Sequence, residues 1–286
     1  MRRLSAALIA LAVTAVIVTV DVVPAHGQEA LICRKRDKTL GKGDNHKNFG
    51  PGRDYVNGGE GRDVLRGGPG ADIINGGRGN DRVYGGGGRD VVCGGIGNDK
   101  VYGGRGDDEI YGEEDNDEMF PGPGDDYALG SAGRDRVYGW GKKGGRFIAD
   151  GIDTIDGGHT QDVVQAGGAD VVLGGSEDDV LRTKTMDVAP QLMDGGYQHD
   201  EIYGSNGDDR ILGDVGDDLI RGRGGNDVIR GQGSEDRIFG GLGNDFLYGG
   251  KNRDFLSGGP GNDLCNGGEL DRGDRSDGTC ERKVDF

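Results

Sequence analysis

The sequence predicts an all-β repeat protein in which many short strands stack on one another. A nine-residue pattern recurs along most of the 286-residue chain, starting in phase at Gly58, Gly67, Gly76, Gly85, Gly94 and Gly103. The last three residues of each copy alternate polar, apolar, and polar or aromatic, which is the period of a strand with one buried face. One apolar residue in nine makes a thin core, so neighbouring copies must cover one another.

The repeat keeps its phase over residues 49–266, which divide into 24 windows of nine residues. Twenty-two windows have Asp at position six and an apolar residue, or Cys265, at position eight. Aspartate occupies 40 of 286 positions, so chance does not produce this phase. The tiling needs one deletion near Gly167-Gly168 and one three-residue insertion, Thr183-Lys184-Thr185.

The repeats are degenerate around residues 139–194. Window 139–147 has Gly144 at position six, and window 186–194 has Gln191 there. Because the stretch 139–156 is two full windows long, we interpret it as a worn coil with a bulge rather than as a domain boundary.

The composition shows that the repeats must accommodate a large negative charge with few hydrophobic residues. The chain has 63 glycines, a net charge of −17 and only 33 % hydrophobic residues. Such a chain repels nucleic acid and anionic membranes and attracts cations. Glycine allows the left-handed backbone conformation of tight turns, and the regular Asp supplies a carboxylate to each turn.

The motif G-G-x-G-x-D-x-(apolar)-x resembles the calcium-binding RTX repeats. Its first six positions match in full in the windows that start at residues 58, 67, 76, 85, 94, 103, 240 and 258. The resemblance implies a right-handed parallel β-roll, or β-solenoid, with two windows per turn. It also implies several Ca²⁺ ions, each held between windows n and n+2 by Asp carboxylates and backbone carbonyls. Hard oxygen ligands on a flexible loop suit calcium better than magnesium.

Carried onto this chain, the resemblance assigns the metal ligands by window. Complete motifs pair Asp63 with Asp81, Asp72 with Asp90, Asp81 with Asp99, and Asp90 with Asp108, and the glycine ligands are Gly58, Gly67, Gly76, Gly85 and Gly94. Windows that keep most of their glycines add Asp209, Asp218, Asp227, Asp245 and Asp263. Asp117 is set apart because Asp115 replaces a turn glycine, and structural or weak sites are expected at Asp153, Asp162, Asp170 and Asp179.

The resemblance also implies that calcium is part of the fold. Stacked windows bring like charges together, so a metal-free roll is opposed by repulsion and binding free energy becomes folding free energy. We expect affinities of about 10⁻⁴–10⁻³ M, the extracellular range, and a chain that orders only after export.

The two ends of the chain carry separate signals. Arg2 and Arg3 precede an uncharged, mostly apolar run, Leu4 to Val20, and residues 1–27 fit a cleaved secretory signal. The alternative is an uncleaved membrane anchor. We expect a secreted protein, with no stable membrane insertion after cleavage. Residues 28–48 and 267–286 are expected to cap the roll, which exposes a strand edge at each end.

The four cysteines of an exported chain favour disulfides. Of the three possible connectivities we favour Cys265–Cys280, which are close in sequence, together with Cys33–Cys93.

Four aromatic residues, Tyr84, Tyr102, Phe120 and Tyr138, occupy position nine of alternate windows. With two windows per turn they stack up one face of the roll. The ladder either packs only against itself or presents a strip for polysaccharide, a cell-surface partner or self-association.

No catalytic signature accompanies the repeats: the sequence has neither H-E-x-x-H nor G-x-S-x-G. The favoured function is a non-enzymatic, calcium-binding structural or adhesive protein. The alternative is an extracellular polysaccharide-acting enzyme on a β-solenoid.

Overall fold

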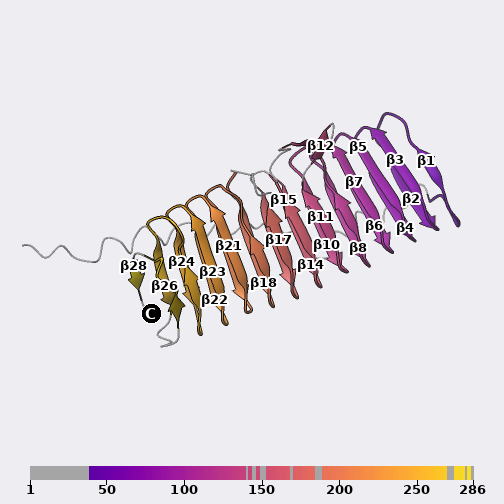
Figure 1. The fold of residues 1–286 in the computed structure, drawn as a ribbon. Helices are drawn as coiled ribbons and strands as arrows, with labels where there is room; N and C mark the ends of the chain where they lie inside the picture. The colour runs from indigo at the N-terminus through magenta and orange to yellow at the C-terminus, as the bar shows by residue number, and fades with distance from the viewer. Residues whose placement is uncertain are drawn as a thin grey trace, which may run out of the picture.

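The described residues of the computed structural model are 39–139, 141–143, 146–148, 153–167, 170–183, 189–268, 274–280 and 282–284. Over this part of the chain all regular secondary structure is β, in two parallel sheets of 13 strands and one separate two-stranded sheet. Successive strands alternate between the two large sheets, so that two windows make one coil of an elongated stack (Figure 1). The predicted all-β parallel roll is therefore confirmed.

Sheet 1 contains, in spatial order, β1 (His46–Asn48), β3 (Val64–Pro69), β5 (Arg82–Gly87), β7 (Lys100–Arg105), β9 (Glu118–Phe120), β11 (Arg136–Gly139), β15 (Val163–Ala166), β17 (Val180–Thr183), β19 (Glu201–Tyr203), β21 (Leu219–Gly224), β23 (Arg237–Leu242), β25 (Phe255–Ser257) and β27 (Arg275–Ser276). Sheet 2 contains β2 (Tyr55–Glu60), β4 (Ile73–Arg78), β6 (Val91–Ile96), β8 (Glu109–Glu114), β10 (Tyr127–Ala132), β14 (Thr154–His159), β16 (Val171–Ser176), β18 (Leu192–Tyr197), β20 (Arg210–Val215), β22 (Val228–Gly233), β24 (Phe246–Gly250), β26 (Leu264–Gly268) and β28 (Arg282–Val284).

The strand register follows the nine-residue repeat. Most neighbours within a sheet pair residues 18 positions apart, as Val83 pairs with Val101. The offset is 17 between β14 and β16, across the deletion, and 21 between β16 and β18, across the insertion. Each irregularity of the sequence is absorbed locally, and the position-eight residues stay opposite one another.

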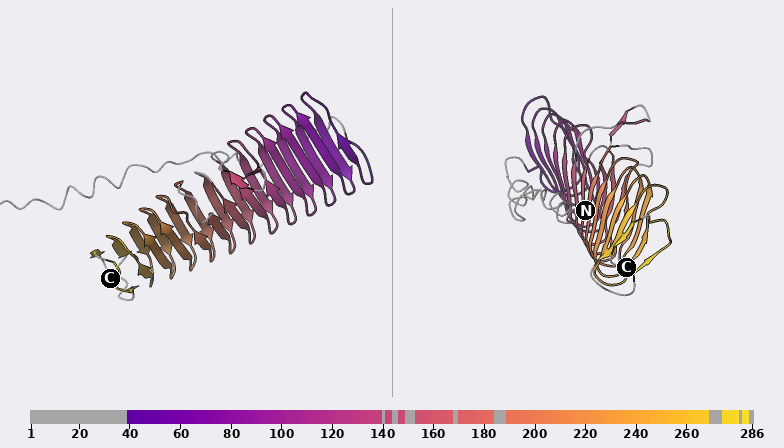
Figure 2. Two further views of the ribbon diagram at one scale, coloured as in Figure 1. Left: turned by 45° about the horizontal axis from the view of Figure 1, so that its top comes forward. Right: turned by 90° about the vertical axis from the view of Figure 1, so that its left-hand side faces the viewer.

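One window leaves the stack. The offset between β10 and β14 is 27, because after Gly139, which ends β11, the described residues of the window 139–147 contribute no strand to either large sheet. The window instead contains β12 (Gly141–Lys143) and begins β13 (Arg146–Ile148), which pair antiparallel and project from the side of the stack (Figure 2). Of the stretch 139–156, interpreted from the sequence as a worn coil with a bulge, only the second window supplies a strand of a large sheet, β14, and the first window forms this hairpin. The first window has Gly144 at position six and so offers no carboxylate there.

The core is a single file of position-eight side chains between the sheets. Each is buried, from Val56 at the beginning through Ile155 to Cys265 at the end, and together they form one continuous apolar cluster. Positions seven and nine of the same strands point outward because side chains alternate along a strand. The predicted thin core, covered by neighbouring copies, is confirmed.

The stack continues beyond residues 49–266. At one end β1 pairs in parallel with β3, and at the other β27 and β28 pair in parallel with β25 and β26. The predicted Cys265–Cys280 disulfide is present and closes this second end. Cys33, and with it the predicted Cys33–Cys93 bridge, lies outside the described residues, as do the predicted signal 1–27 and residues 28–38. In the part of the chain that is described, no helix is suited to cross a bilayer.

Candidate metal sites

The position-six aspartates form two columns, one along each sheet, at the point where the turn enters the strand. From Asp63 to Asp263 these aspartates are buried, with 0–4 % of their surface exposed, whereas Asp54 in the first window is only partly buried. Along the columns the Oδ1 atom accepts a hydrogen bond from the backbone N–H of the residue that lies one coil earlier, which is an aspartate in most coils, Asn45 for Asp63 and Gln191 for Asp209. The four predicted pairs all make this contact: Asp63 N–H to Asp81 (2.7 Å), Asp72 to Asp90 (2.8 Å), Asp81 to Asp99 (2.7 Å) and Asp90 to Asp108 (2.9 Å).

The second carboxylate oxygen, Oδ2, points at the position-one glycine of its own window. A Cβ on Gly76 would lie 2.5 Å from Oδ2 of Asp81 and 2.5 Å from the carbonyl oxygen of Gly94, one coil further on. On Gly85 the corresponding distances are 2.6 Å to Asp90 and 2.5 Å to the Gly103 carbonyl. Glycine is thus favoured at position one, although Pro121 occupies it in one window, because two oxygens, one from each of two coils, converge on the space that a side chain would fill.

These converging oxygens lack a hydrogen-bond donor. Within the described residues, Oδ2 is buried without a hydrogen-bond partner in Asp63, Asp72, Asp81, Asp90, Asp99, Asp108, Asp117, Asp135, Asp162, Asp179, Asp200, Asp218, Asp227, Asp236, Asp245 and Asp263. A buried polar atom left unsatisfied costs about 1–3 kcal/mol, and more when it is charged. Two acceptors facing one another without a donor are the arrangement that a hard cation satisfies.

The donor set fits calcium through main-chain oxygens rather than through clustered side chains. Among the described residues no three His, Cys, Asp or Glu side chains gather closely enough to hold a metal ion by themselves. The carbonyls of Gly76, Gly85 and Gly94 face Oδ2 of Asp63, Asp72 and Asp81 respectively. Carboxylate plus carbonyl oxygens are typical calcium ligands, and they occur at every coil with an intact turn.

The columns raise the pKa of their own carboxyl groups. Burial is the main cause, and the charge of neighbouring column aspartates adds to it. The pKa rises to about 6 for Asp81 and Asp90 and to about 8 for Asp99 and Asp108, and the hydrogen bond from the preceding backbone N–H opposes the rise without cancelling it. Asp99 and Asp108, whose pKa lies above neutral pH, therefore need a positive partner to stay ionised there, whereas Asp81 and Asp90 are mostly ionised but destabilised.

Comparison with known families now bears on this geometry. The sequence model of the RTX calcium-binding nonapeptide repeat matches overlapping stretches that together cover residues 50–141, 148–181 and 192–271, most of the chain. The chain belongs to the RTX family. Its repeats are calcium-binding repeats, and the unmatched gaps fall at the β12–β13 hairpin and at the insertion before β18. No curated protein sequence matches the chain significantly.

The RTX columns run through the region that the sequence marks as degenerate. Asp117, Asp153, Asp162, Asp170 and Asp179 are as buried as the aspartates of complete motifs. The column is continuous across the excluded window, where Asp126 N–H donates to Asp153 (3.1 Å) and Asp135 N–H to Asp162 (2.7 Å). Their burial places them in the same columns as the other aspartates, and structural or weak calcium sites at these positions stay a prediction.

Sequence reasoning also left several column members out of the candidate sites. These are Asp126, Asp135, Asp200, Asp236 and Asp254, together with Asp274, which lies in the segment expected to be a cap. Their position-six phase was the signal for all but Asp274. They were passed over because glycines were missing from their turns.

The RTX turn survives these replacements because other residues adopt the glycine conformation. Glu113 has φ of 83° and Asp115 has φ of 75°, the left-handed region that position two and position four require. Ser131 and Asp214 do the same in other coils. A short polar side chain tolerates this region better than a β-branched one. The turn therefore keeps its backbone conformation even where the sequence no longer matches the glycine motif.

A second ladder, at position five, went unrecognised in the sequence. The Asn80 Oδ1 atom accepts the N–H of Asn98 (3.2 Å), and Asn98 in turn accepts the N–H of Asn116 (3.0 Å). Near the other end Asn226 and Asn244 repeat the pattern. These exposed amides tie successive turns together outside the carboxylate columns. The recurrence of Asn and Asp at position five was the available signal.

The predicted aromatic ladder is present on the outer face of sheet 1. Tyr84, Tyr102, Phe120 and Tyr138 stack with ring centroids 4.6–4.9 Å apart and planes within 7° of parallel. The guanidinium of Arg66 covers the outer ring, 4.6 Å from the Tyr84 centroid. The ring faces are therefore used within the ladder, which leaves ring edges and hydroxyl groups for a partner. We name these four residues the aromatic column.

Proposed function

We propose that this protein is a secreted RTX repeat protein whose roll folds around calcium and then acts as a rigid structural or adhesive rod. The observation that carries the proposal is the convergence, coil after coil, of a buried Oδ2 atom and a glycine carbonyl without a donor. The residues proposed to hold the ions are Asp63, Asp72, Asp81, Asp90, Asp99, Asp108, Asp209, Asp218, Asp227, Asp245 and Asp263, with the glycine carbonyls beside them. Asp209 is proposed on the motif alone, because its Oδ2 atom already accepts the Ser205 N–H (2.6 Å).

Calcium would then make folding depend on the compartment in which the chain lies. In a calcium-poor cytoplasm the ionised columns oppose stacking, so the chain is proposed to stay unfolded until export. Outside the cell calcium is abundant, and metal binding supplies folding free energy. A disulfide at the C-terminal end is consistent with an oxidising destination.

The adhesive part of the proposal rests on the aromatic column. Its four rings lie half-buried on an outer sheet face, at a constant spacing along the roll. Because the ring faces are occupied, a bound polysaccharide would meet the ring edges and accept or donate hydrogen bonds at the hydroxyls of Tyr84, Tyr102 and Tyr138. Such a surface suits a long, linear partner better than a compact one.

The test is a double substitution, Tyr84→Ser with Tyr102→Ser, assayed against a panel of neutral and acidic polysaccharides in calcium. We expect binding to be lost while the calcium-induced β signal in circular dichroism is kept. Tyr248→Ser, on the outer face of sheet 2, is the matched control and should bind normally. Unaltered polysaccharide binding by the double variant would remove the aromatic column from the proposal, and loss of self-association alone would identify the partner as a second copy of the chain.

A further inference from the structure

A row of cationic side chains runs beside the aromatic column. Arg82, Lys100 and Arg136 occupy position seven of β5, β7 and β11, two residues before Tyr84, Tyr102 and Tyr138. Residues two apart on a strand point to the same face. The outer face of sheet 1 therefore carries hydroxyl-bearing rings beside cationic side chains at β5, β7 and β11, and Glu118 of β9 interrupts the positive row between Lys100 and Arg136. This face belongs to a chain whose net charge is −17.

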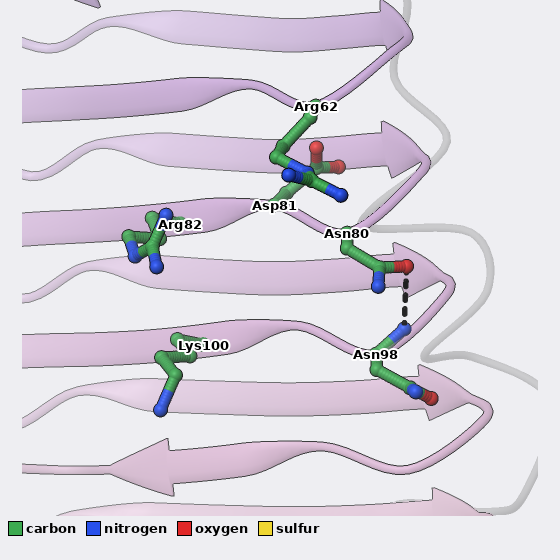
Figure 3. Close-up of a pocket in the computed structure, with 6 residues that line it drawn as sticks. All are labelled: Arg62, Asn80, Asp81, Arg82, Asn98 and Lys100. Carbon is green, nitrogen blue, oxygen red and sulfur yellow. Dashed lines mark hydrogen bonds between the residues drawn. The ribbon is translucent and has the colours of Figure 1, made fainter.

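The cationic row opens into a pocket of about 220 Å³ at the edge of β5 and β7. Arg62, Arg82 and Lys100 line it together with the side-chain amides of Asn80 and Asn98, and Figure 3 shows these groups around the depression. The remaining lining residue, Asp81, is only 2 % exposed, and its Oδ1 atom accepts the Asp63 N–H. The solvent side of the pocket is thus formed by hydrogen-bond donors and positive charge.

Two of these cations have no carboxylate of their own. Within the described part of the chain neither Arg62 nor Arg82 forms an ion pair, whereas Lys100 pairs with Glu118 on the next strand of sheet 1. Exposed arginines beside amide groups are suited to hold a carboxylate or a sulfate, because the planar guanidinium makes two parallel hydrogen bonds to such groups.

We infer that this face binds an anionic glycan, with its acidic groups at Arg62, Arg82 and Lys100 and its sugar hydroxyls at Tyr84 and Tyr102. This inference rests on the proposed polysaccharide contact and names the class of glycan. Neighbouring strands lie about 4.8 Å apart, which is close to the length of one pyranose residue in an extended chain. A linear acidic polysaccharide lying along the roll can therefore present a charge to each coil in turn.

Calcium is required for this contact for a second reason beyond folding. Asp81 and Asp99 lie one residue before Arg82 and Lys100, buried just beneath them. While these carboxylates are ionised and unpaired, they weaken the attraction for an anion. A cation held between the coils neutralises them and leaves the surface row positive.

The experiment compares two matched polymers in saturating calcium by isothermal titration calorimetry: dextran sulfate and unsulfated dextran. Oligogalacturonate forms a third arm and separates carboxylate from sulfate as the preferred group. We expect the full chain to bind at least one acidic polymer roughly tenfold or more tighter than dextran, since a hydrogen bond to a charged group contributes about 1.5–3 kcal/mol. Arg82→Gln with Lys100→Gln should remove that preference and leave dextran binding unchanged.

The control is Arg210→Gln with Arg230→Gln, which removes the same charge from the outer face of sheet 2 and should keep the preference. Equal affinity of the full chain for acidic and neutral polymers would overturn the inference, and so would an unchanged preference in the Arg82 and Lys100 variant. If the Tyr84 and Tyr102 variant still loses dextran binding in that case, the proposed polysaccharide surface stands without its acidic specificity. Absence of binding to every polymer would overturn both.

Discussion

Replacing one column aspartate by asparagine should have opposite effects on the metal-free and the calcium-bound protein. Asp90 is suited to this change because both of its neighbours in the column, Asp72 and Asp108, belong to complete motifs. In Asp90→Asn the Oδ1 atom still accepts the Asp72 N–H, which lies 2.8 Å away in the native protein. The new amide nitrogen takes the place of Oδ2 and can donate to the carbonyl of Gly103.

The magnitude follows from the pKa of the carboxyl group. Burial is the main reason that the folded pKa of Asp90 is about 6, against an unfolded value of 3.8. At neutral pH this difference corresponds to an ionisation penalty of about 3 kcal/mol in the absence of metal. Only a few such aspartates are needed to offset the typical domain stability of about 5–15 kcal/mol. Asp90→Asn removes one penalty and also one carboxylate ligand.

The assay has two arms. In excess chelator, the pH at which the chain gains β signal in circular dichroism should move upward for Asp90→Asn, because one fewer carboxyl group must be protonated. In calorimetry at neutral pH, calcium uptake should weaken by roughly tenfold at the affected coils, since affinity depends on the number of charged ligands. Asp107→Asn is the control, because Asp107 is exposed and its Oδ1 atom only accepts the Asp125 N–H. The reasoning is refuted if the two variants behave alike.

Acidification should partly replace calcium. Burial raises the folded pKa of column aspartates above the unfolded value of 3.8, to about 6 for Asp81 and about 9 for Asp117 and Asp236. The metal-free roll is therefore stabilised below pH 4 and loses that stabilisation as pH rises through about 6 to 9. Circular dichroism in chelator should show β signal appearing on acidification, and a signal that instead disappears towards pH 4 would contradict the sign. Gly76→Ala should destabilise the roll by several kcal/mol, because its Cβ would lie 2.5 Å from the Gly94 carbonyl, while Gly87→Ala, with no atom within 4 Å, should be tolerated. Equal thermal stability of these two variants in calcium would speak against the convergence of oxygens at position one.

The sequence predicts most of this fold because the same pattern recurs in nearly every window, and each copy predicts the same turn and strand. Every position-eight residue of the described windows in the two large sheets lies in the core, since a buried position between two sheets favours apolar side chains. A smaller buried cluster at position nine, made of Cys93, Tyr111 and Leu129, was not predicted. The pairing of Asp63 with Asp81 and its equivalents follows from the period and from the family geometry together. The Cys265–Cys280 disulfide is predictable because the two residues are close in sequence.

The features that the sequence did not predict depend on three-dimensional context. The window 139–147 has the same length as the other windows, and only the strand pairing shows that it is left out of the two large sheets. Motif matching ranks the window of Asp117 low because it counts glycines, whereas the backbone needs only the left-handed conformation that Asp115 also adopts. The cationic pocket joins residues of three windows, so no single motif contains it.

The most direct test of calcium-dependent folding is a calcium titration of the chain at neutral pH, followed by circular dichroism and calorimetry, with magnesium as the control ion. The columns of buried, donor-free Oδ2 atoms predict an unfolded spectrum in chelator, a cooperative gain of β signal with several bound calcium ions, and little response to magnesium. A β signal of equal strength in chelator, or the absence of calcium uptake, would contradict it.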